Sequence, residues 1–397
     1  MRPIPERSIA TNTLVIGGGA AGLAAAACLS RRRIPHILLE KGQSIGSSWL
    51  NRYDRLHLHT HGFFSSLPYL SFPRHFPRYP SRLQFAEYLA TYADAFQLKP
   101  RFGEEVSSLL RQQQGWVAQT QNVAVLAKHV VVATGYSHKP RRPSWPGEET
   151  FAGQILHSSA YVNGEQFKDK RVLVVGFGNS AGEIAIDLHE HGAQVSMAVR
   201  NPVNIVPRDL FGLSTHVISV MMSRLPTELA DALSKNLRNL VVGDMAPYGL
   251  EKANIGPMTM IKRENRVPLL DIGTVGLIKT GKIVVQKGID YFDGRQIKFV
   301  DGVQKDFDAV VLATGYTTNL TSFLENADTV TDDHGRVIGG GHESALPGLY
   351  FCGLHNAPAG LIRQMGIDAK RIAKSISKKP RSIARVTSQD QPAMLAV

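Results

Sequence analysis

Three glycines, Gly17, Gly19 and Gly22, form a GxGxxG pattern directly after an apolar run that ends at Ile16. Glycines in this pattern permit a tight turn and let the backbone approach a pyrophosphate, while the N-terminus of a following helix attracts the phosphate charge. The next apolar run ends in Glu40, whose carboxylate can accept hydrogen bonds from ribose hydroxyls. We interpret the pattern as a dinucleotide site for a ribose without a 2′-phosphate; a purely structural glycine turn is the alternative.

A second glycine pattern begins at Gly176 and Gly178, with Ala181 in the third place and Gly182 after it. Here the following apolar run ends near Arg200 instead of an acid. A guanidinium can pair with a ribose 2′-phosphate, which a carboxylate would repel. The first site is therefore predicted to bind FAD and the second NADPH, with an ordinary surface arginine as the alternative role of Arg200.

Both turns are predicted to join a strand to a helix in βαβ units. The expected elements are strands at 13–16, 36–40, 171–175 and 194–199 and helices at 20–32 and 180–191. Two further apolar runs end in Ala-Thr-Gly-Tyr, at 133–136 and 313–316. Each is expected to close one nucleotide-binding region, because its glycine lets the backbone approach a neighbour closely.

These units predict an α/β fold with two doubly wound Rossmann-type dinucleotide-binding domains, the NADPH domain being inserted in the FAD domain. The expected boundaries are 1–160 for the first part of the FAD domain, 161–305 for the NADPH domain, and 306–397 for the rest of the FAD domain with a C-terminal helix. A segment rich in Met, Pro and Leu at about 209–263 is predicted to be a helical insertion. Its Met221, Met222 and Met245 are expected to pack between helices, with the wall of a substrate tunnel as the alternative.

Composition narrows the class of protein. The chain has 397 residues, long enough for two domains, and a net charge of +12 that is dispersed, so no nucleic-acid partner is expected. The densest basic run, at 370–385, is interpreted as a solvated helix and tail, and contact with a membrane surface is the alternative. The N-terminus lacks the apolar core of a signal peptide, and glycines interrupt the first apolar run, so no transmembrane segment is expected.

The two cysteines, Cys28 and Cys352, are far apart and form no CxxC motif. This usage favours a reducing compartment, and we predict a cytoplasmic protein. A chain with two dinucleotide sites and no dithiol cannot pass electrons to an internal disulfide. Oxygen, an organic substrate or another protein remain as electron acceptors.

The stretch FAGQILHSSAY supplies a further pattern, FxGxxxHxxxY, through Phe151, Gly153, His157 and Tyr161, and LATGY follows at 312–316. With the order of the two glycine turns, these motifs make the chain similar to the flavin-containing monooxygenases over nearly its whole length. The resemblance implies an enzyme that uses FAD, NADPH and molecular oxygen through a C4a-(hydro)peroxyflavin. It also implies a small organic substrate and a possible homodimer.

Within that family, four runs resemble the plant YUCCA branch, at 53–59, 67–89, 199–215 and 268–285. The branch is associated with oxidative decarboxylation of indole-3-pyruvate to indole-3-acetate, so a carbonyl or 2-oxo acid substrate is the favoured expectation. The alternatives are N- or S-oxygenation of soft nucleophiles, Baeyer–Villiger oxidation of ketones and, more remotely, a redox-sensing nucleotide-binding protein that does not oxygenate.

The turn patterns and the resemblance together predict two sets of binding residues. For FAD they are Gly17, Gly19, Ala20, Gly22, Glu40, Lys41, Ser48, Trp49, His59, Ala133, Thr134, Gly135 and Gly353. For NADPH they are Gly176, Gly178, Asn179, Ser180, Arg200, Asn201, Ala313, Thr314 and Gly315.

Two histidines are the candidate catalytic residues. His59 aligns with an asparagine that other family members carry near the flavin, so the resemblance implies a hydrogen-bonding role at the flavin site. His157 is expected to hold the junction between the domains rather than to act as an acid or base. His57, His59 and His61 alternate and could share one face of a strand, but no acid or cysteine ligand is nearby in the sequence, and no metal site is predicted.

Overall fold

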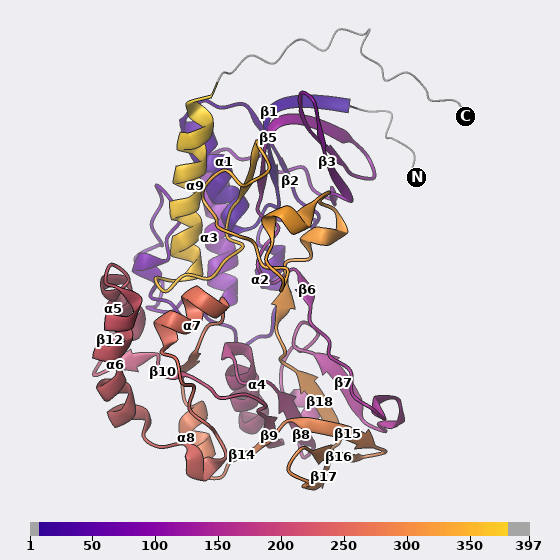
Figure 1. Cartoon of the computed structure of the whole chain (residues 1–397), viewed down its shortest axis with the longest axis vertical. Coiled ribbons are helices and arrows are strands. Elements are labelled where there is room, and N and C mark those ends of the chain that lie inside the picture. The colour runs from indigo at the N-terminus through magenta and orange to yellow at the C-terminus, as the bar shows by residue number, and fades with distance from the viewer. Residues whose placement is uncertain (1–7, 380–397) are drawn as a thin grey trace.

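The structure is a computed structural model, and the description covers residues 8–379, except for the side chains of residues 236–238. Two α/β units lie one above the other along the long axis, with the N-terminal strand and the last helix both in the upper unit (Figure 1). Each unit is built around its own sheet and its own hydrophobic clusters. The molecule thus has the two Rossmann-type units that the sequence predicts.

The upper sheet has the strand order β2-β1-β5-β4-β3, and β20 also pairs with β5. Pairing is parallel for β1 with β2 and β5 and for β5 with β20, whereas β3, β4 and β5 form an antiparallel meander. The strands are β1 (Ser8–Ile16), β2 (His36–Leu39), β3 (Ser108–Gln112), β4 (Gly115–Gln119), β5 (Ala124–Val132) and β20 (Leu349–Phe351).

Three helices cover the upper sheet on one side (Figure 1). They are α1 (Ala20–Arg31), α3 (Arg82–Ala95) and α9 (Leu361–Ser377). The alanine-rich run of α1 has almost no exposed surface, because small side chains let the helix approach both the sheet and α9. A short helix, α2 (Ser47–Leu50), follows β2 and packs against α3.

The lower sheet is entirely parallel, in the order β14-β9-β8-β18-β7. Its strands are β7 (Gln154–His157), β8 (Arg171–Val175), β9 (Gln194–Ala198), β14 (Ile283–Gln286) and β18 (Ala309–Leu312). Helices α4 (Asn179–Glu190) and α8 (Thr274–Lys279) pack on it. An antiparallel sheet is added by β15 (Ile289–Asp293), β16 (Gln296–Phe299) and β17 (Gln304–Asp306).

Strand pairing corrects both expected boundaries between the units. Strand β7 ends before residue 160 and β18 begins after residue 306, yet both lie in the lower sheet. The chain crosses between the sheets after each Ala-Thr-Gly-Tyr turn, and the crossings pair as the antiparallel strands β6 (Lys139–Pro140) and β19 (Tyr316–Thr317). The boundary was misplaced because an isolated apolar strand does not show which sheet it joins.

The segment after β9 forms the predicted helical insertion beside the lower unit (Figure 1). It contains β10 (Ile205–Pro207), the hairpin β11 (Asp209–Leu210) and β12 (Leu213–Ser214), the helices α5 (Thr215–Met222), α6 (Thr227–Val242) and α7 (Pro257–Glu264), and β13 (Leu269–Asp271). The buried carboxylate of Asp231 on α6 accepts hydrogen bonds from the backbone of Met258 and Thr259, at 2.9 and 3.0 Å. It thereby caps α7 and fixes the two helices together.

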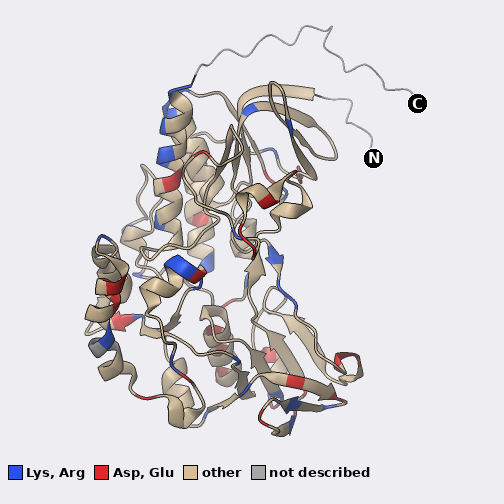
Figure 2. Ribbon diagram, viewed as in Figure 1, with Lys and Arg blue, Asp and Glu red and all other residues tan. Residues whose placement is uncertain are grey.

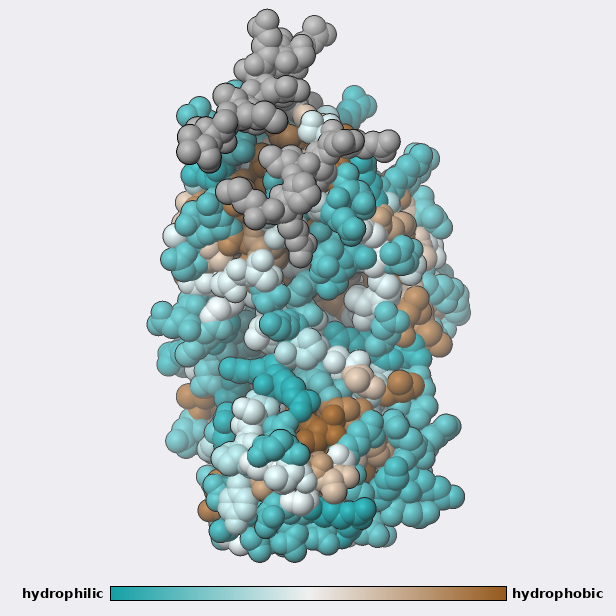
Figure 3. Space-filling model, turned by 90° about the vertical axis from the view of Figure 1, so that its right-hand side faces the viewer, coloured by the Kyte–Doolittle hydropathy of each residue, from teal (hydrophilic) through white to brown (hydrophobic). Residues whose placement is uncertain are grey.

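Among the described residues, six short segments are 3-10 helices, at Gly62–Phe64, Glu148–Thr150, Glu165–Phe167, Ala246–Tyr248, Leu320–Ser322 and Ala327–Val330. Basic and acidic residues are scattered over both units, with basic residues along α9 (Figure 2). The face on the side of β3 and β7 is mostly hydrophilic, with separate small hydrophobic patches (Figure 3). Within residues 8–379, no helix is long and apolar enough to cross a membrane. The end of the basic run, 380–385, lies outside the described residues.

Candidate active site

The first glycine turn connects β1 to α1 with no room for side chains at two positions. Gly17 has φ +106°, and a Cβ there would overlap the carbonyl oxygen of Ala133; a Cβ on Gly22 would overlap the carbonyl of Gly17. At Gly19, by contrast, an added Cβ meets nothing within 4 Å, and Gly19 lies on the wall of a large cavity. Gly17 and Gly22 pack the turn, whereas Gly19 leaves space for a ligand to approach the backbone.

Glu40 follows β2 and holds this turn through its side chain. One carboxylate oxygen accepts a hydrogen bond from the Gly18 backbone N–H at 2.5 Å, and the other accepts from Gly42 at 2.7 Å. Each oxygen keeps further acceptor capacity, and Glu40 and Lys41 both line the cavity. The carboxylate is therefore fixed on the cavity wall beside the turn, and its contact with a ribose stays a prediction.

The second glycine turn repeats the packing of the first. Gly176 has φ +121°, and a Cβ there would lie 2.6 Å from the carbonyl oxygen of Ala313. Helix α4 begins at Asn179, whose side-chain oxygen accepts a hydrogen bond from the Leu270 backbone at 2.7 Å. In both units the alanine of Ala-Thr-Gly-Tyr thus packs against the first glycine of the turn.

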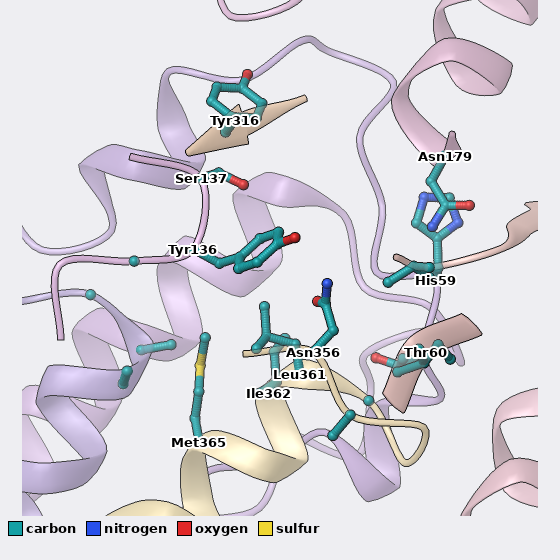
Figure 4. Close-up of a pocket in the computed structure, with 18 of the residues that line it drawn as sticks. His59, Thr60, Tyr136, Ser137, Asn179, Tyr316, Asn356, Leu361, Ile362 and Met365 are labelled. Atoms are coloured by element: carbon teal, nitrogen blue, oxygen red, sulfur yellow. The ribbon is translucent and has the colours of Figure 1, made fainter. Parts of the chain in front are cut away.

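A cavity of about 810 Å³ extends between the two units and the insertion. Figure 4 shows His59, Tyr136, Asn179 and Tyr316 around its interior and Met365 rising from α9. The predicted residues on its wall are Gly17, Gly19, Ala20, Glu40, Lys41, Ser48, Trp49, His59, Ala133, Thr134, Gly135, Asn179 and Ser180. The structure therefore brings together the first turn, α2, the first Ala-Thr-Gly segment and the start of α4.

Other predicted residues lie off this wall. They are Gly22, Gly353, Gly176, Gly178, Arg200, Asn201, Ala313, Thr314, Gly315 and His157. Gly353 has φ +72°, and a Cβ there would press on Ala21 and Met365, so this glycine allows α9 to approach α1. Arg200 and Asn201 are exposed after β9, outside the cavity. Their assignment to NADPH stays a prediction.

His59 and a buried carboxylate meet where the units touch. Nε2 of His59 lies 3.4 Å from a carboxylate oxygen of Glu183 on α4, whose side chain is 2% exposed. The Tyr53 hydroxyl donates to the same oxygen at 2.5 Å. Burial and the neighbouring Glu183 raise the pKa of Tyr53 well above its usual value, so the phenol remains a donor. Both ring nitrogens of His59 are buried without a hydrogen-bond partner among the described residues, so Nε2 has only its contact with Glu183.

The FxGxxxHxxxY residues have structural partners in the lower unit. A Cβ on Gly153 would press on Phe151 and on the carbonyl of Asp308. The Tyr161 hydroxyl donates to Asp187 at 2.6 Å. Glu183 and Asp187, four residues apart on α4, are each held by a tyrosine from a segment outside that helix.

The three alternating histidines have separate partners. Nδ1 of His57 contacts the carbonyl of Arg55, whereas Nδ1 of His61 accepts from the Phe63 backbone. Within the described ranges, no three His, Cys, Asp or Glu side chains are grouped so that they could hold a metal ion. The shared strand face considered for these histidines is not formed.

The insertion supplies an apolar part of the cavity wall. Ile218 and Met222 of α5, Leu233 of α6 and Met258 and Ile261 of α7 line it. Met222 lies on this wall, which is the alternative considered for the three methionines, whereas Met221 and Met245 lie off it. Helix α5 is anchored there by His216, whose Nδ1 accepts from the His61 backbone and whose Nε2 donates to Ala359 at 2.8 Å.

Several site residues were missed from the sequence: Arg52, Tyr53, Tyr136, Glu183, Arg208 and Asn356. One signal was available for Glu183, which lies in the apolar run of α4 directly after a glycine turn. A residue in such a run is expected to be buried, and a buried carboxylate needs a partner. The guanidinium of Arg52 lies 4.7 Å from the ring centre of Tyr316 and also donates to its hydroxyl. No sequence pattern links these two residues.

Comparisons with known proteins agree with this geometry. The family model described as pyridine nucleotide-disulphide oxidoreductase matches residues 14–226. Indole-3-pyruvate monooxygenase YUCCA1 of Oryza sativa subsp. japonica is 41% identical over 333 residues, 82% of this chain and 82% of that protein. Among solved structures, a flavin-containing monooxygenase from Stenotrophomonas maltophilia has a TM-score of 0.72 at 22% identity, covering 93% of this chain and 98% of that one. The crystal structure of OTEMO complexed with FAD and NADP has a TM-score of 0.69 at 17% identity, covering 95% and 86%.

Two dinucleotide-binding units around one shared cavity, with these relatives, define a flavin-dependent monooxygenase that uses a nicotinamide cofactor, oxygen and an organic substrate. The chain belongs to the YUCCA family of monooxygenases, within the wider pyridine nucleotide-disulphide oxidoreductase family. It has no dithiol in the described part of the chain, where Cys28 and Cys352 are free and buried.

Proposed function

We propose that this protein is an FAD- and NADPH-dependent monooxygenase that acts on a small apolar 2-oxo acid of the indole-3-pyruvate type. One observation supports this most: a single cavity is lined by the first glycine turn, by the start of α4 and by the apolar wall of the insertion. This arrangement would let two cofactors and a hydrophobic substrate meet in one cavity. The names of the relatives point to the same substrate class.

The upper unit is the proposed FAD site, and its residues fit that group. Gly19 leaves open space at the helix N-terminus for a pyrophosphate, and Glu40 is placed to accept ribose hydroxyls. The buried Thr134 hydroxyl has no partner among the described residues and can bond to a ligand on this wall. When bound, FAD accepts hydride from the nicotinamide and activates oxygen.

The lower unit is the proposed NADPH site. Asn179 and Ser180 open α4 on the cavity wall, where the helix N-terminus favours phosphate. Arg200, exposed at the end of β9, is the proposed partner of the 2′-phosphate. Strands β6 and β19 pair, so the two segments that connect the units are joined to each other. Both segments would therefore move together when one unit moves against the other.

Other parts of the proposed function depend on the protein's own side chains. The apolar residues of α5, α6 and α7 exclude water from the reacting groups. His59 is the proposed polar group at the flavin, with Nδ1 free to exchange a hydrogen bond and Nε2 beside Glu183. The proposed compartment is the cytoplasm, which suits two unpaired thiols.

The test uses the purified protein loaded with FAD. NADPH oxidation, oxygen uptake and product mass are measured with indole-3-pyruvate, phenylpyruvate, a thioether, a tertiary amine and a cyclic ketone. We expect coupled turnover and release of carbon dioxide with the two 2-oxo acids. Oxygenation of only the thioether or the amine would reject the 2-oxo acid assignment, and lactone formation from the ketone alone would identify Baeyer–Villiger chemistry instead.

A further inference from the structure

Three cationic side chains lie on the wall of the cavity within the described residues: Lys41, Arg52 and Arg208. Lys41 follows Glu40 beside the first glycine turn, and Arg52 is engaged with Tyr316. Arg208 comes from the insertion side, between β10 and β11, next to the apolar residues that line the chamber. Of the three cations, Arg208 is therefore the one that comes from the same insertion as the hydrophobic part of the wall.

The side chain of Arg208 is held in one orientation. Its Nε donates to Asp209 at 3.1 Å, and its guanidinium carbon lies 4.2 Å from the ring centre of Tyr79. The Tyr79 hydroxyl in turn donates to the other oxygen of Asp209 at 2.6 Å. Because Nε is engaged, the two terminal nitrogens form the free fork of the guanidinium, and no described residue accepts a hydrogen bond from them.

The charge around Arg208 is not neutralised by its partner. Arg78 also contacts Asp209, at 3.3 Å, so two guanidinium groups share one carboxylate and leave one positive charge. Arg78 lines a smaller outer cavity of about 470 Å³, whereas Arg208 lines both this cavity and the large one. Arg208, one of the two residues that carry this excess charge, is thus also on the wall of the large cavity.

We propose that the terminal nitrogens of Arg208 bind the carboxylate of the substrate while the apolar wall holds its hydrocarbon body. A planar fork matches a carboxylate in a bidentate manner, and an anion in an apolar chamber requires such a partner. This inference rests on the proposed function, because it names the residue that would distinguish a 2-oxo acid from an uncharged ketone. The ligand class is an aryl or alkyl carboxylate.

The test compares two probes that differ only at the acid: phenylpyruvate and phenylacetone. Their binding to the FAD-loaded protein without NADPH is measured by calorimetry for the wild type, Arg208→Met, Arg208→Lys and Arg78→Met. Arg78→Met is the matched control, since it also removes a partner of Asp209 but does not line the chamber. Flavin content and circular dichroism report whether each variant is folded.

We expect Arg208→Met to weaken phenylpyruvate binding by about tenfold to a hundredfold, the value of a charged hydrogen-bonded pair, and to leave phenylacetone within about twofold. Arg208→Lys should lie between, and Arg78→Met should lose less than about threefold for either probe. Equal losses for both probes in Arg208→Met, or no loss for phenylpyruvate, would overturn the assignment.

A second pair of probes separates this inference from the proposed function. If the wild type binds phenylacetate in an Arg208-dependent manner but neither binds nor turns over 2-oxo acids, the carboxylate site stands and the proposed reaction does not. If the wild type binds no aryl carboxylate at all, both are rejected.

Discussion

Nε2 of His157 lies 3.1 Å from the carbonyl oxygen of Gly315, and the backbone N–H of Ser159 donates to Nδ1 of the same ring at 3.1 Å. Because Nδ1 accepts, the ring hydrogen is on Nε2 and is donated to Gly315. Burial lowers the pKa of His157 below its usual value, which favours this neutral form. The residue therefore fixes the second Ala-Thr-Gly-Tyr turn against β7, and its role at the junction between the domains stays a prediction.

Replacing His157 should loosen the second Ala-Thr-Gly-Tyr turn in the lower unit and so disturb the position of that unit against the upper one. His157→Leu removes the donor to Gly315, and we expect hydride transfer from NADPH to slow by about three- to tenfold while flavin content is retained. Anaerobic stopped-flow measurement of flavin reduction tests this, with His334→Leu, at an exposed turn, as the control. A loss confined to oxygen-dependent steps would contradict the positioning role.

Substitutions of Gly17 and Gly19 in the first turn should affect different properties, the stability of the fold and the affinity for FAD. Gly17→Ala forces a side chain into φ +106° and onto Ala133, and should lower the free energy of unfolding by about 2 to 4 kcal/mol. Gly19→Ala, at φ −76° with open space around it, should leave the stability of the flavin-free protein within about 0.5 kcal/mol and weaken FAD binding. Denaturant unfolding and flavin titration measure the two effects. Unchanged flavin affinity in Gly19→Ala would argue against phosphate binding at this turn.

Arg200 should determine the choice of nicotinamide cofactor. Arg200→Ala removes the proposed partner of the 2′-phosphate, so the KM for NADPH should rise by about tenfold or more, whereas the KM for NADH should change little. Steady-state kinetics with both cofactors provide the comparison, and Lys305→Ala, at another exposed cation of the same unit, is the control. Equal changes for the two cofactors would remove Arg200 from this role.

His129 on β5 should make the protein sensitive to mild acid. Burial and the charges of Lys379 and Lys128 lower its pKa from about 6.5 to about 4, against the opposing effect of Glu343. Between these values the unfolded chain binds a proton that the folded protein does not, so stability falls as the pH decreases through this window. His129→Gln should reduce the loss of stability between pH 7 and 4.5 by about 2 to 3 kcal/mol. Urea unfolding at several pH values measures it, and an unchanged pH profile would contradict the assignment.

The bond from Tyr53 to Glu183 should contribute to stability because both groups are buried. Tyr53→Phe leaves the carboxylate without its phenol donor and should cost about 1 to 3 kcal/mol of unfolding free energy. Tyr291→Phe, on the outer antiparallel sheet, is the control and should change little. A Tyr53→Phe protein as stable as the wild type would show that another donor satisfies Glu183.

Much of the fold could be predicted from the sequence because the two βαβ units are specified locally. β8 was predicted with its bounds, and the first residues of α1 and α4 within one position, since glycine turns and apolar runs are short-range signals. The boundaries at 160 and 306 were wrong for the opposite reason: no strand was predicted at 154–157, and only the pairing of β18 with β8 and of β7 with β18 places both strands in the lower sheet.

The sequence by itself determined the two glycine turns, the Ala-Thr-Gly-Tyr strands and the class of chemistry, because each depends on residues close together in the chain. Tertiary structure alone decided that Glu183 meets Tyr53 and His59, more than a hundred positions away, and that Arg208 lies on the cavity wall. Such contacts depend on how two sheets and an insertion close around one space. Local propensity and periodicity carry no information about that closure, because they describe which face of an element is apolar and not which element it will meet.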